Sequence, residues 1–116
     1  VTQWPDQPFS TWVSSQCPWN NFEIQIEMGD ESDIESIDAI IGDWYQAGYE
    51  GAFGLGDQGM LHEISDPIKL GEKTVAYFVD CGRASEDCVI DLLNRLAVHH
   101  DIRPINNVLF GKGYVI

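Results

Sequence analysis

One change of hydrophobic period, between residues 22 and 44, constrains the fold of this chain more than any other feature. From Phe22 to Met28 apolar and polar residues alternate strictly, which is typical of a strand with one buried face. From Ile34 to Trp44 the apolar residues instead recur three or four positions apart, as in an amphipathic helix. Each element has one apolar face to bury, so the pair predicts a helix packed on a sheet.

The rest of the chain repeats this pattern. Apolar runs predict further strands at 60–65, 74–80 and 105–110. A second helix is expected over 86–100, because its apolar residues lie on one face and Pro104 prevents its continuation. The order strand, helix, strand, strand, helix, strand is the ferredoxin-like plan. We therefore predict an α+β, ferredoxin-like βαββαβ fold, with an antiparallel sheet and two helices on one face.

The expected core combines the apolar faces of these elements. It consists of Phe22, Ile24, Ile26, Ile37, Ile41, Trp44, Val75, Tyr77, Val79, Leu92, Leu93 and Leu96.

The length of 116 residues favours one domain, over 22–116, preceded by an N-terminal arm over 1–21. The arm carries three of the four tryptophans and three prolines, and the prolines exclude a continuous helix. Because the aromatic side chains need burial, we expect the arm to pack on the domain, with a possible short strand over 11–15. Whether it also docks a partner is left open by the sequence.

Charge is distributed very unevenly along the chain. The first 68 residues contain 13 of the 19 carboxylates and neither lysine nor arginine, so the net charge of −13 arises there. Such a field repels nucleic acid and anionic membranes, and attracts a basic protein. The predicted partner-binding residues are the acids on or near the outer face of the first helix and in the loop after it. They are Glu31, Glu35, Asp38, Asp43, Glu50 and Asp57.

Catalytic and cofactor motifs are weak in this sequence. Residues 54–59 form a literal GxGxxG, but Pro67 leaves no room for the helix that a dinucleotide site requires, so no cofactor is expected. His62 is isolated, and His99 and His100 lack a third ligand at a useful spacing, so no metal site is predicted and the latter two are expected at a solvated helix end. With no catalytic constellation evident, we do not expect an enzyme.

Three cysteines without a CxxC spacing indicate a reduced chain. The sequence also lacks a signal-peptide pattern and a long apolar run, so it is expected to be cytoplasmic and not associated with membranes.

Two resemblances accompany these features. In size, charge and compactness the chain resembles small acidic bacterial immunity proteins, including those that neutralise contact-dependent growth-inhibition toxins. Its plan is also similar to the RraB family of acidic ferredoxin-like regulators that bind an endoribonuclease. There the matching motifs are Ala47-Gly48-Tyr49-Glu50, Val79-Asp80-Cys81 and Gly111-Lys112-Gly113-Tyr114. Both resemblances imply an inhibitor that acts by binding.

We thus expect a protein inhibitor, of immunity or antitoxin type, that binds and occludes a basic toxin or nuclease. The alternative is a ferredoxin-like regulatory module, dimeric, that binds a small ligand in a pocket shaped by the glycine-rich segment.

Overall fold

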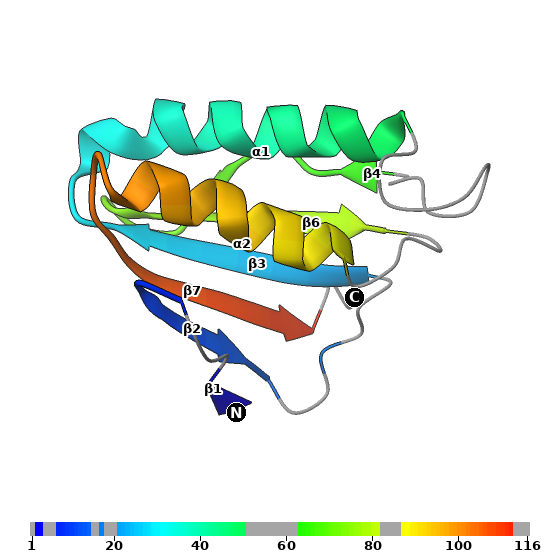
Figure 1. The fold of residues 1–116 in the computed structure, drawn as a ribbon, viewed down its shortest axis with the longest axis horizontal. Coiled ribbons are helices and arrows are strands. Elements are labelled where there is room, and N and C mark those ends of the chain that lie inside the picture. The colour runs from blue at the N-terminus through cyan, green and yellow to red at the C-terminus, as the bar shows by residue number, and fades with distance from the viewer. Residues whose placement is uncertain are drawn as a thin grey trace.

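A computed structural model describes residues 2–3, 7–14, 17, 21–50, 63–81 and 87–112, with the backbone alone at 2, 3 and 112. Within these ranges two α-helices cover one face of a mixed, seven-stranded sheet (Figure 1). The predicted α+β class is confirmed. No helix among the described residues has the length and apolar character needed to cross a membrane.

The middle of the sheet consists of three long strands. β3 (Asn21–Met28) lies between β6 (Thr74–Asp80) and β7 (Ile105–Lys112) and is antiparallel to both. On the far side of β6, two short strands, β4 (Glu63–Ile64) and β5 (Ile68–Lys69), pair antiparallel with it. β6 has the predicted bounds, whereas β5 lies in a segment for which no strand was predicted.

The described part of the N-terminal arm extends this sheet beyond β7. β2 (Ser10–Val13) pairs in parallel with β7, and β1 (Thr2–Gln3) pairs antiparallel with β2. The prediction of a purely antiparallel sheet is therefore wrong at this edge. No hairpin joins β2 to β7, since the whole domain separates them in sequence, so nothing imposes an antiparallel pairing.

Both helices lie on the same face of the sheet, as predicted (Figure 1). A turn of 3-10 helix, η1 (Glu31–Asp33), leads into α1 (Ile34–Tyr49), and α2 (Asp87–His100) lies beside α1. All the predicted core residues are buried between the helices and the sheet. The buried indole of Trp44 donates through Nε1 to the carbonyl of Cys88 at 2.7 Å and so links the two helices.

Candidate functional site

The outer face of α1, with the residues flanking it, is acidic. The side chains of Ile37, Ile41 and Trp44 point into the core, so residues on the opposite side of the helix face solvent. The predicted acids that lie in the described ranges are all exposed: Glu31, Glu35, Asp38, Asp43 and Glu50. Among the described residues no lysine or arginine forms an ion pair with them. The sixth predicted residue, Asp57, lies outside the described ranges.

Asp38 differs from the other acids of this face because it also supports the core. The hydroxyl of Tyr77 on β6 donates to Asp38 Oδ1 at 2.9 Å. Tyr77 is buried, and this burial, together with its hydrogen bond to the Asp38 carboxylate, raises the pKa of Tyr77. Asp38 therefore anchors α1 to the sheet in addition to contributing charge.

Ser32 and Glu35 have the spacing of a capping box, but the structure places the side-chain cap elsewhere. The carboxylate of Asp30 accepts from the Ser32 amide at 2.9 Å, and this bond lowers the pKa of Asp30. The cap thus lies before η1, and Asp33, the residue before α1, makes no capping bond with its side chain. The reason is the 3-10 turn, which moves the first unsatisfied amides upstream.

Asp33 instead turns into the protein, where it is 1% exposed. Its Oδ2 lies 2.8 Å from Nε2 of His99, near the end of α2. Its Oδ1 is buried without a hydrogen-bond partner, and Nη1 of Arg103 is 3.9 Å away, too far for a hydrogen bond. The expectation of a solvated His99 is wrong, since its side chain is 12% exposed and paired with a buried acid.

The neighbouring His100 is also engaged. Its Nδ1 accepts from the Ile105 amide at 2.9 Å, and its ring packs edge-on against Phe9. His62 lies outside the described ranges. Within the part of the chain that is described, no group of three or more His, Cys, Asp or Glu residues is arranged to hold a metal ion.

A cavity of about 300 Å³ adjoins the buried carboxylate. Its lining comes from the segment before η1, from η1 itself and from the turn after α2: Gly29, Asp30, Ser32, Asp33, Arg103 and Pro104. Arg103 also points its Nη1 toward the Ser32 hydroxyl, at 3.4 Å. The cavity therefore contains two carboxylates and one guanidinium, and it lies at the end of α1 where the acidic face begins.

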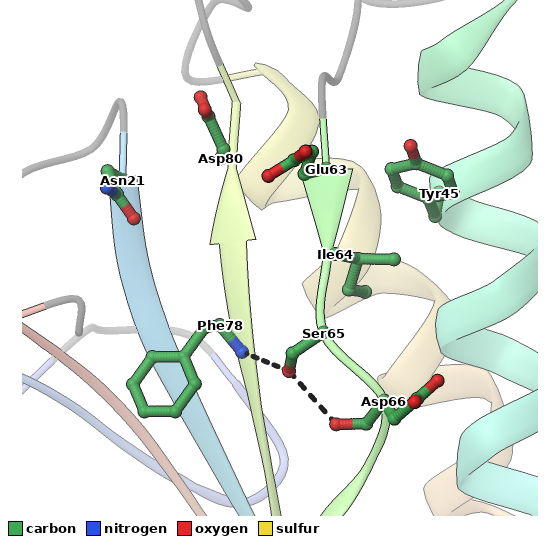
Figure 2. A pocket seen from close by; sticks show the side chains of 8 residues that line it. All are labelled: Asn21, Tyr45, Glu63, Ile64, Ser65, Asp66, Phe78 and Asp80. Carbon is green, nitrogen blue, oxygen red and sulfur yellow. Dashed lines mark hydrogen bonds between the residues drawn. The ribbon is translucent and has the colours of Figure 1, made fainter.

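A larger cavity of about 590 Å³ lies around β4 (Figure 2). Ser65 shapes its wall, because its hydroxyl accepts from the Phe78 amide and donates to the Asp66 carbonyl. Glu63 stands opposite Asp80 in the strand register. The side chains that line this cavity are mostly polar or acidic: Asn21, Tyr45, Glu63, Ile64, Ser65, Asp66, Phe78 and Asp80.

Two of the three free cysteines form a contact that the sequence did not indicate. Cys81, after β6, and Cys88, in the first turn of α2, are both buried, and a hydrogen bond joins their thiols. This bond raises the pKa of Cys81 and lowers that of Cys88. Burial raises the pKa of Cys17 to about 11. In this arrangement the buried pair has little access to reagents.

The pair of Asp33 and His99 is the main feature that sequence reasoning missed. A signal was present, since Asp33 falls on the same helical phase as Ile37, Ile41 and Trp44. A carboxylate at a helix position that faces the core needs a buried partner.

Comparison with models of known families, with curated proteins and with solved structures gives no match for this chain.

Proposed function

We propose that this protein is an inhibitor that binds a basic protein through the outer face of α1 and blocks its active site. The observation that carries the proposal is the set of exposed carboxylates on this face, which have no lysine or arginine partner among the described residues. Such charges have not been neutralised within the chain, so their field extends into solvent. A basic surface would be attracted to it over about a Debye length, roughly 8–10 Å at ordinary salt.

The fold supports this function by placing α1 at the surface. The path β7-β3-β6-β4, with α1 and α2 on one face, is consistent with the ferredoxin-like plan that we assign to this domain. In that plan the sheet holds one face of each helix and leaves the other free for a partner. The rigid helix thus presents its charges in a fixed array.

A nuclease toxin is the class of partner that fits such an array best. An enzyme that acts on RNA or DNA has a basic groove for the phosphates. A row of carboxylates is complementary in charge to that groove. It therefore accelerates association with the enzyme and excludes the nucleic-acid substrate. This proposal agrees with the resemblance to immunity proteins, for which the partner is the toxin encoded upstream of the immunity gene.

The test compares two variants that each remove four negative charges. The first changes the α1 face and its flanks, and the second changes exposed acids elsewhere. The face variant is Glu31→Gln, Glu35→Gln, Asp43→Asn and Glu50→Gln; the control variant is Glu27→Gln, Glu72→Gln, Asp87→Asn and Asp101→Asn. Asp38 is retained in both because it holds Tyr77.

Association with the toxin domain encoded directly upstream is followed by stopped flow at two salt concentrations, with nucleic-acid cleavage as the second readout. We expect the face variant to associate severalfold more slowly than the control, with a smaller salt dependence and weaker inhibition. Equal association rates and equal salt slopes for the two variants would overturn the assignment of this face. A neighbouring gene that encodes no basic toxin would count against the inhibitor itself.

A second candidate function, binding of a small regulatory ligand, is favoured by the cavity around β4. Its volume of about 590 Å³ is in the range of small-molecule sites. Its acidic walls would select a cationic ligand. Thermal-shift screening of small polyamines and nucleosides tests this candidate, and a stabilising nucleoside but no stabilising polyamine would contradict the charge argument.

A further inference from the structure

We propose that the cavity beside Asp33 is an anchor pocket, which receives a guanidinium or ammonium side chain from the basic partner. The anchor pocket is the 300 Å³ cavity lined by Asp30, Ser32, Asp33 and Arg103, together with Gly29 and Pro104. This inference rests on the proposed function, because it names the group of that partner which is bound most closely.

The first argument is that one oxygen of Asp33 lacks a hydrogen-bond partner. A buried acceptor without a donor is unfavourable, and more so when the acceptor is charged. Oδ2 is satisfied by His99, whereas Oδ1 has no hydrogen-bond partner. A ligand that donates an N–H to Oδ1 would remove this cost, so the pocket selects a donor.

The second argument is charge. Asp30 and Asp33 line the pocket against one base, Arg103, so it favours a cation. The Ser32 hydroxyl adds an acceptor. A guanidinium carries five donors in a planar fork, which can serve several oxygens at once, and it is desolvated more readily than an ammonium. An arginine side chain of the partner is therefore the preferred occupant.

The third argument is the position of Arg103, which lines the pocket but makes only long contacts there. Its Nη1 is 3.9 Å from Asp33 Oδ1 and 3.4 Å from Ser32 Oγ, and its side chain is 51% exposed. Arg103 is thus a weak internal substitute for the partner's cation. On binding, the incoming guanidinium takes the place of Arg103, which turns into solvent.

The location of the pocket completes the argument. Its lining residues Asp30 and Ser32 flank Glu31 in the sequence, and Glu31 is the first of the exposed acids of the α1 face. The exposed acids would steer the partner, and the pocket would hold one of its side chains in a desolvated contact. Such a buried contact, surrounded by weaker charged contacts, is the usual arrangement of a binding hot spot.

The test uses ethylguanidinium as the probe and NMR of the His99 ring and the Arg103 side chain as the readout. In the unmodified protein we expect saturable shifts of both groups, and no saturable shifts with neutral ethylurea. Arg103→Gln should tighten probe binding severalfold, because the competing cation is gone. Lys69→Gln is the matched control, since it removes the same charge from an exposed site on β5 and should change the affinity much less.

Asp33→Asn should abolish the saturable shifts, but it also disturbs His99. Asp30→Asn avoids this problem, because Asn caps a helix as well as Asp does, and it should weaken probe binding severalfold. Equal effects of Arg103→Gln and Lys69→Gln, or the absence of saturable shifts in the unmodified protein, would overturn the anchor pocket. If the face variant still slows toxin association in that case, the proposed function stands. If the probe binds but no basic toxin does, the cavity is a guanidinium site, but the proposed function and the anchoring role that rests on it both fail.

Discussion

The hydrogen bond between Tyr77 and Asp38 allows a sharp test of the link between the acidic face and the core. Tyr77→Phe removes the hydroxyl and leaves the ring in place. A hydrogen bond to a charged group contributes about 1.5–3 kcal/mol when buried. Here the Asp38 end is exposed, so water screens the bond and we expect about 1–2 kcal/mol. For a domain of this size that corresponds to a fall in Tm of roughly 4–8 °C.

The assay is a double-mutant cycle with Asp38→Ala, measured by urea unfolding followed by circular dichroism. Both single variants should be destabilised, and the double variant should be hardly worse than either one. The coupling free energy from the cycle then measures the contribution of the hydrogen bond between Tyr77 and Asp38, about 1 kcal/mol or more. If the two effects simply add, the hydroxyl and the carboxylate do not interact, and Asp38 is only one of the exposed acids of the α1 face.

The same pair gives a signed prediction for high pH. The folded state raises the pKa of Tyr77 above its usual value of about 10, first through burial and then through the Asp38 carboxylate. As pH rises, the tyrosine therefore loses its proton in the unfolded chain before it does so in the folded protein. The stability that protonated Tyr77 contributes is full below about pH 10 and is lost as pH rises through the folded pKa. Above pH 10 the unmodified protein should lose stability more steeply than Tyr77→Phe. If the free energy of unfolding falls with pH equally in both proteins, the raised pKa of Tyr77 is contradicted.

Three further predictions concern the core, the end of α2 and the thiols. Leu93→Ala, at a fully buried position, should cost about 2–5 kcal/mol in urea unfolding. His100→Ala leaves the Ile105 amide without its acceptor, so it should cost about 1–3 kcal/mol while toxin association is unchanged. In the folded protein, Cys81 and Cys88 should react with a thiol reagent only at the rate of unfolding, so reaction within seconds would contradict their burial.

Local periodicity was sufficient to predict the central elements of this fold. In β3 the buried and partly exposed residues alternate as the sequence does, because one face of a central strand meets the helices and the other does not. The bounds of β6 follow from its continuous apolar run, and most of α2 follows from the helical spacing of its apolar residues. These elements were predictable because each has an apolar face that can be buried in only one way.

Features that depend on pairing between distant segments were not predictable in this way. The parallel pairing of β2 with β7 joins residues almost a hundred positions apart, and no turn between them fixes its direction. The capping residue at the start of α1 was not predictable for a different reason. Asp30 and Ser32 are both good capping residues, and only the 3-10 turn of η1 decides that Asp30 is used.

Asp33 shows why counting charged residues in a sequence does not identify a candidate site. In the sequence it is one of many acids near the first helix, yet its helical phase is that of Ile37 and Ile41, not that of the exposed acids. An acid at such a phase must find a partner, but the sequence offers several histidines and bases, and the one chosen, His99, lies 66 residues away. The position of Asp33 on the helix therefore identifies it as the acid that must be buried. That one of its oxygens lacks a hydrogen-bond partner depends on how α2 and the turn containing Arg103 pack against α1, which the sequence does not reveal. The exposed acids give the protein its negative field, and Asp33 adds a buried carboxylate with one oxygen that lacks a hydrogen-bond partner.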